Sequence, residues 1–261
     1  MNQSLPCRVG RGKTEYGGKV RQVQTGPLAG FAGLVAALSG LDATVGLTRA
    51  GWLAGIGSAA ALTVLVSVAL ERTAHHPSPA DRITLLRAEM ACAVTALAVG
   101  AHAVGLLVAL AAVALVLDGV DGRVARRTGR VSWFGARFDM EVDAFLILVL
   151  SGYVAHAAGW WVLLIGAARY VFVASSWALP WLRGTIAPRP WCKVVAVVQG
   201  VVLTVVAAGV LPLAWERVSL AVALSLLAES FGREVHDLWR ARGEAADRVP
   251  VAAERVLVGH G

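Results

Sequence analysis

Residues 117–144 read LDGVDGRVARRTGRVSWFGARFDMEVDA and place four aspartates beside long apolar runs. Asp118 and Asp121 are three residues apart, and Asp139 and Asp143 are four apart. If both segments are helical, each pair projects from one face of its helix. Two such faces brought together would form a cluster of hard oxygen ligands, which suits Mg²⁺ or Mn²⁺ better than zinc. The stretch therefore predicts a divalent-metal site between two helices.

The composition around this stretch is typical of an integral membrane protein. Hydrophobic residues make up 57% of the 261 residues and charged residues 16%, and the mean hydropathy is +0.66. The net charge is +7, but the basic residues lie between apolar runs and form no single stripe. This pattern favours contact with anionic lipid over nucleic-acid binding. The three cysteines form no CxxC pair, so the sequence indicates neither a disulfide framework nor a zinc site.

The apolar runs predict an all-α, polytopic helical membrane protein, since each is close to the ~20 residues that cross a bilayer. We expect a six-helix catalytic domain within residues 81–240, preceded by two additional transmembrane helices within 27–72. Residues 1–26 are expected to form a mobile, cytosolic N-terminal arm, and 241–261 a cytosolic tail. The expected spans are 27–47, 52–70, 83–100, 103–127, 134–155, 160–182, 194–213, and 218 to 227 or beyond.

The distribution of Lys and Arg predicts the orientation of these spans. The basic segments lie at the N-terminus, at 71–82, at 123–130, at 183–193 and in the C-terminal tail. Eight spans place all of them on one side, which the positive-inside rule makes the cytosol. We therefore expect a multi-pass protein of the plasma (inner) membrane whose termini and aspartates face the cytosol.

A simpler interpretation of the aspartates is that they lie at the membrane interface and pair with Arg123, Arg126 and Arg137. Such exposed pairs would stabilise the protein little. A carboxylate at the centre of a membrane helix costs roughly 2.5–3.5 kcal/mol on insertion scales. Because the two pairs both have helical spacing, we favour a functional site.

These residues also match a family motif. The pattern D-x-x-D-G-x-x-A-R-x8-G-x3-D-x3-D is complete, and the chain from Ile83 onward resembles the CDP-alcohol phosphotransferases (CDP-alcohol phosphatidyltransferases), membrane enzymes of phospholipid synthesis. The matching residues are Asp118, Asp121, Gly122, Ala125, Arg126, Gly135, Asp139 and Asp143. The two helices before Ile83 lie outside the resemblance.

The resemblance implies an enzyme that cleaves a CDP-linked alcohol, foremost CDP-diacylglycerol, releases CMP and transfers the substituted phosphate to a polar alcohol. It implies two Mg²⁺ or Mn²⁺ ions, held by Asp118, Asp121 and Asp139, with Asp143 beside the second ion. Asp143 would also be the general base for the incoming hydroxyl. The resemblance further implies a homodimer.

The other motif residues would bind the nucleotide part of the donor. Gly122 and Ala125 would leave room for the cytidine, and Arg126 would donate to a diphosphate oxygen. Gly135 would let its helix start close to the preceding one. Upstream, DRITLLR resembles the segment that opens the family's first span, so Thr84 and Arg87 would border the nucleotide. Their alternative roles are a helix cap and a snorkelling anchor.

The acceptor stays open at this stage. Arg169 lies within an apolar run, and with Lys193, Arg183 and Arg189 it would form a pocket for a phosphorylated acceptor; the alternative for the last three is a role in topology alone. KVVAVVQ at 193–199 is similar to the glycerol-phosphate-using branch, but FDMEVDAF departs from that branch. Glu89 and Glu229 are the expected partners of Arg169 or Arg233.

Two other classes of protein also use clustered aspartates. A membrane prenyltransferase binds Mg²⁺-diphosphate through two acidic motifs, but it would show an NDxxD-like first motif and would not explain the glycines and Arg126. A transporter or other non-catalytic ion-binding protein would use the carboxylates to carry cations.

Overall fold

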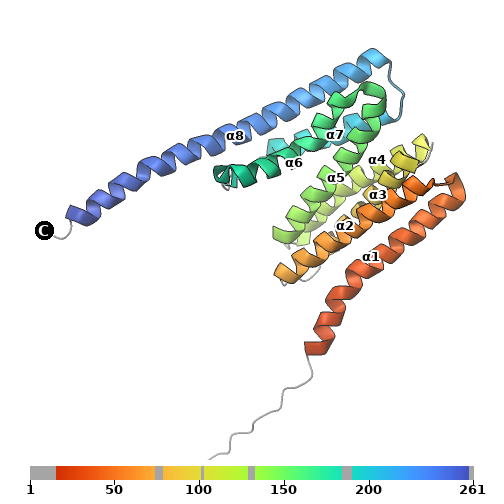
Figure 1. Ribbon diagram of the computed structural model, residues 1–261, viewed down its shortest axis with the longest axis horizontal. Helices are drawn as coiled ribbons and strands as arrows, with labels where there is room; N and C mark the ends of the chain where they lie inside the picture. The colour runs from red at the N-terminus through yellow and green to blue at the C-terminus, as the bar shows by residue number, and fades with distance from the viewer. Residues whose placement is uncertain (1–15, 74–78, 101–102, 129–132, 184–189, 259–261) are drawn as a thin grey trace, which may run out of the picture.

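The computed structural model describes residues 16–73, 79–100, 103–128, 133–183 and 190–258, and every element within these ranges is helical. The prediction of an all-α protein is therefore confirmed for the described residues. Figure 1 shows the order of the helices along the chain. They are α1 (Tyr16–Val45), α2 (Arg49–Thr73), α3 (Pro79–Gly100), α4 (Val104–Thr128), α5 (Trp133–Ala158), α6 (Leu163–Ala178), α7 (Pro190–Ala207) and α8 (Leu213–Val258), with the short 3-10 helices η1 (Trp160–Val162) and η2 (Pro180–Arg183) flanking α6.

Glycines in the left-handed region follow three of these helices. Gly46 has a φ of 66°, Gly159 of 109° and Gly209 of 65°. A residue with a side chain is strained at such angles, so glycine is the usual residue just after a helix. The ends of α1, α5 and α7 are thus fixed by the sequence itself.

The largest differences from the sequence prediction are at the start of α1 and the end of α8, and α7, expected at 194–213, spans Pro190–Ala207. α1 begins at Tyr16, so part of the segment expected to be a separate N-terminal arm is helical. α8 continues to Val258 and includes most of the expected C-terminal tail. In both places polar residues extend an apolar helix, and hydropathy marks only the apolar part. The break between α3 and α4 lies between the spans expected at 83–100 and 103–127.

Within the part of the chain that the structure describes, two helical segments are long and apolar enough to cross a membrane, Arg82–Gly100 and Trp160–Ala178. Three shorter apolar segments accompany them, Gly30–Val45, Val104–Val120 and Trp191–Ala207. Length and composition thus agree with a membrane protein. The arrangement of eight spans and its orientation stay predictions.

α5 lies between two groups of helices (Figure 1). α1, α2 and α3 gather on one side of it, and α6, α7 and α8 on the other. α3 packs against α1, α2, α4 and α5, so it connects the first group of helices to α4 and α5. A core of buried Leu, Val and Ala side chains runs from α3 and α4 through α5 into α7 and α8.

α2 and α3 touch through their backbones. A Cβ built on Gly100 would lie only 2.5 Å from the Cα of Gly51, and the amide of Thr48 donates to the carbonyl of Gly100 at 3.0 Å. A side chain at either glycine would force the two helices apart. The pair formed by α1 and α2 is therefore fixed firmly to the helix that carries Thr84 and Arg87.

Candidate metal centre

Three of the four motif aspartates converge. Asp118 comes from α4, and Asp139 and Asp143 come from successive turns of α5. One oxygen from each of the three carboxylates lies within 4.8 Å of the others. The three side chains are partly buried, with exposed fractions of 26%, 32% and 27%. Two helices thus present their acidic faces to one point, as the helical spacing predicted.

The cluster suits a hard divalent cation. Its donors are carboxylate oxygens, which Mg²⁺ and Mn²⁺ prefer, and they are close enough together to share an ion. Partial exposure also leaves a route for ligands and water, which Mg²⁺ keeps in its coordination shell. The residues therefore fit the predicted ion in both chemistry and spacing.

An arginine from a third helix completes the cluster. The Nη1 of Arg87 on α3 lies 2.5 Å from Oδ1 of Asp139 and 3.2 Å from Oδ1 of Asp118. Its Nη2 donates to Oδ1 of Asp143. The Arg87 side chain is only 1% exposed, although it is charged. Buried charges persist where they are paired, and here three carboxylates surround one guanidinium.

The structure describes the surroundings of only some of the other predicted site residues. Thr84 is buried on α3, one turn before Arg87 and on the same face. Gly135 is half-buried in the first turn of α5, one turn before Asp139. The other motif positions fall in the last part of α4, whose side chains lie outside the described residues. These are Asp121, Gly122, Ala125 and Arg126.

The alternative pairing of the aspartates with nearby arginines stays untested. Arg137 is exposed on the first turns of α5, and Arg123 and Arg126 are outside the described side chains. Among the described side chains Arg87 meets the aspartates, and the sequence placed it only at the border of the nucleotide. Its partners on α5 are 52 and 56 residues away in the chain, so spacing alone could not identify them.

Arg169 has a partner that the sequence analysis missed. Its Nη2 donates to Oε1 of Glu141 on α5 at 2.6 Å, and its Nε to Oε2 at 3.4 Å. Glu141 lies two residues from both Asp139 and Asp143, so it projects about 200° away from them around the helix. The ion pair is therefore on the opposite face of α5 from the aspartate cluster. The sequence signals that could have indicated this pair were an arginine in an apolar helix and a glutamate in the preceding helix.

The other acidic and basic residues singled out from the sequence lie elsewhere. Glu229 pairs with Arg233 one turn along α8, as one of the expected combinations. Glu89 borders a small hollow of about 30 Å³ between α1, α2 and α3. Lys193 is exposed on α7, and the side chains of Arg183 and Arg189 lie outside the described residues. A shared acceptor pocket of Arg169 and Lys193 stays a prediction.

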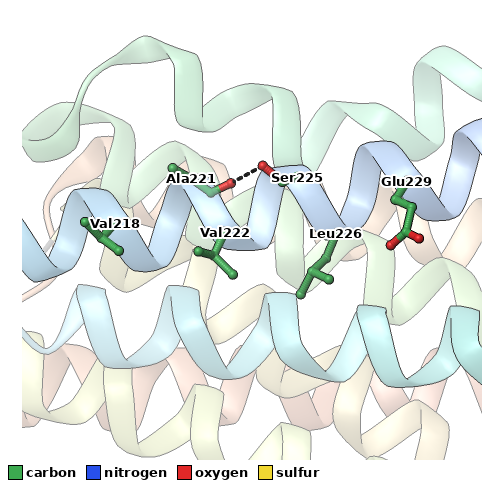
Figure 2. Close-up of a pocket in the computed structure, with 6 residues that line it drawn as sticks. All are labelled: Val218, Ala221, Val222, Ser225, Leu226 and Glu229. Carbon is green, nitrogen blue, oxygen red and sulfur yellow. Dashed lines mark hydrogen bonds between the residues drawn. The ribbon is translucent and has the colours of Figure 1, made fainter.

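A larger hollow, of about 380 Å³, opens along α8, as Figure 2 shows. All its lining residues come from one face of that helix, at spacings of three and four. The hydroxyl of Ser225 donates to the carbonyl of Ala221 at 2.8 Å and so is used within the helix (Figure 2). The residues that line this hollow bring no polar groups together from different helices, so it does not resemble a reacting site. The lining residues are Val218, Ala221, Val222, Ser225, Leu226 and Glu229.

Comparison with known proteins adds one finding. The family model for CDP-alcohol phosphatidyltransferase matches residues 77–228, which is more than half of the chain. The match includes α3 to α7 and the first part of α8, and hence every residue of the aspartate cluster. α1 and α2 precede it. No curated protein and no solved structure gives a significant match.

Proposed function

Because the chain belongs to the CDP-alcohol phosphatidyltransferase family, we propose that it is a membrane phosphotransferase acting on CDP-diacylglycerol and a polar alcohol. The observation that carries the proposal is the convergence of Asp118, Asp139 and Asp143 from two helices inside the matched region. Clustered carboxylates are what an enzyme needs to hold divalent ions beside a diphosphate.

In the proposed reaction the hydroxyl oxygen of the acceptor attacks the phosphorus that carries the diacylglycerol. The bond from this phosphorus to the bridging oxygen breaks, and CMP leaves with that oxygen and its electron pair. The hydroxyl proton passes to the carboxylate of Asp143, which acts as the general base. Asp143 lies one turn from Asp139, so base and metal ligand stand on the same face of α5.

Asp118, Asp121 and Asp139 would hold two Mg²⁺ or Mn²⁺ ions, with Asp143 beside the second. When bound, the ions neutralise the diphosphate and stabilise the charge that develops on the leaving CMP. Gly122 and Ala125 would leave space for the cytidine, Arg126 would donate to the diphosphate, and Gly135 would allow α5 to begin close to α4. Thr84 would border the nucleotide from α3.

The setting of the reaction is part of the proposal. Basic segments on one side of the expected spans support a cytosolic active site in the plasma (inner) membrane, with several passes and both termini inside. Membership of the family supports a homodimer. The acceptor is a polar alcohol, and if it is phosphorylated, Arg169 and Lys193 are the cationic candidates for its phosphate.

The test uses purified protein with CDP-diacylglycerol, Mn²⁺ and a panel of polar alcohols, among them glycerol phosphate, inositol phosphate and serine. We expect CMP and one new phospholipid to appear in equal amounts, with the lipid identified by mass spectrometry. Release of inorganic pyrophosphate from a prenyl diphosphate, without CMP from any CDP-alcohol, would favour the prenyltransferase. Cation flux in proteoliposomes without CMP release would favour an ion carrier.

A further inference from the structure

Arg87 occupies the centre of the proposed metal site. Its two terminal nitrogens face Asp118, Asp139 and Asp143, which are the carboxylates available to a cation. A guanidinium and a divalent ion need the same oxygen lone pairs. The contacts that Arg87 makes are therefore contacts that an arriving ion must share or replace.

The position of Arg87 is fixed by a further bond. Its Nε donates to the backbone carbonyl of Ala114 on α4 at 3.2 Å. Ala114 lies one helical turn before Asp118. The same stretch of α4 therefore accepts the hydrogen bond from Nε of Arg87 and supplies one of the carboxylates that the guanidinium contacts. Nε points to backbone and the terminal nitrogens to carboxylates, which the planar fork of arginine permits. A lysine could not make both sets of contacts.

The charge in the cluster is not balanced. One guanidinium faces three carboxylates, so the described side chains leave an excess of negative charge. Carboxylates this close repel one another, and a positive charge between them lowers that repulsion. Arg87 thus makes the cluster possible without divalent ions and leaves it able to attract them.

We propose that Arg87 is the built-in counter-ion of the metal centre: it holds the three carboxylates together before divalent ions bind, and it gives up carboxylate contacts when they do. Arg87 is then a positioning residue that sets the metal affinity. This inference rests on the proposed function, because it takes the aspartate cluster to be the metal site. The anchor at Ala114 keeps the guanidinium beside the site when the ions arrive.

The test compares Arg87→Gln with the unmodified protein and needs no turnover. Binding of Mn²⁺ alone is measured from the electron paramagnetic resonance signal of the free ion, and thermal unfolding is followed in EDTA and in Mn²⁺. We expect Arg87→Gln to unfold at a lower temperature in EDTA, because the carboxylates repel one another. We also expect it to bind Mn²⁺ at least about tenfold more tightly, because a competing positive charge is gone. Unchanged or weaker Mn²⁺ binding would overturn the proposal.

Arg169→Gln is the matched control, since it removes the same charge from the opposite face of α5. Its Mn²⁺ affinity should stay within about twofold of the unmodified protein. If Arg87→Gln does not fold, Arg87→Lys decides the question. An ammonium holds the three carboxylates less well than the fork, so Mn²⁺ should bind a few times more tightly. Equal or weaker binding by Arg87→Lys would then count against the proposal.

The outcomes separate this inference from the proposed function. Suppose that the unmodified protein releases CMP and that Arg87→Gln binds Mn²⁺ with the same affinity as the unmodified protein. The proposed role of Arg87 is then wrong, and the enzyme assignment stands. If Asp139→Asn leaves Mn²⁺ binding unaltered in a folded protein, the cluster is not the metal site, and both ideas fall.

Discussion

The two faces of α5 carry two arginine contacts of different character. Among the described side chains, Arg87 meets three carboxylates on one face and Arg169 meets Glu141 on the other. The first arginine is 1% exposed and the second 23%. Counted over these side chains, the first contact has more negative than positive charge, whereas the second is one to one. The first contact is therefore the one that suits a further cation.

In the proposed function this difference separates the metal site from a structural contact on the same helix. Both places put charge next to apolar helices, where an unpaired charge is unfavourable. A one-to-one ion pair neutralises both of its charges. One arginine among three carboxylates neutralises them only in part, and a bound divalent ion would neutralise the rest.

Removal of divalent ions should have the largest effect, because it acts on the unbalanced face alone. With excess EDTA we expect CMP release to fall to background and to return when Mn²⁺ is restored. The measurement is CMP formed from CDP-diacylglycerol and the identified acceptor, before and after dialysis. Sustained turnover in EDTA would remove the distinction between the two faces.

Asp143→Asn should come next. It keeps the size of the side chain but removes the proposed base, so CMP release should fall by about 10²–10⁴-fold. The unfolding temperature of the same sample is the control that the protein is folded. Full turnover in a folded Asp143→Asn protein would assign the base to another group.

Glu141→Gln is the matched change two residues away on the balanced face. CMP release should stay within about twofold, since the residue points away from the cluster. The free energy of unfolding should fall by about 1–2 kcal/mol, because Arg169 loses a charged hydrogen-bond partner while keeping some access to solvent. Chemical unfolding in detergent measures this. A loss of activity as large as that of Asp143→Asn would place both faces in the reaction.

The smallest effect should come from combining Glu141→Gln with Arg169→Gln. Two neutral amides replace the ion pair, so neither partner is left as a buried, unpaired charge. We expect the double variant to be no less stable than Glu141→Gln alone, with a coupling energy of roughly 1 kcal/mol from the double-mutant cycle. Strict additivity of the two single changes would show that the contact stabilises nothing.

The sequence predicted the helices well, because long apolar runs ended by glycines such as Gly46 and Gly159 leave few alternatives. It also predicted that Asp118 would meet Asp139 and Asp143, since helical spacing and a complete motif pointed the same way. These predictions depend on the spacing of residues along each helix, which can be counted in the sequence.

The contacts of Arg87 and Arg169 were not predicted, because they depend on how neighbouring helices are rotated and shifted. Arg169 was expected to meet Glu89 or Glu229, yet its partner is Glu141, 28 residues away on the neighbouring helix. Rotation and shift result from many small packing contacts between helices, such as the backbone contact of Gly51 with Gly100. No single residue determines them.

α8 has 46 residues, and at 1.5 Å per residue it is about 69 Å long. In the proposed membrane arrangement α8 crosses beside α7, and a hydrocarbon layer of ~30 Å would accommodate less than half of its length. The rest would then project into water as a rigid spacer, so a fluorophore joined near Val258 would stand tens of ångströms from the headgroups and report on the aqueous phase rather than on lipid.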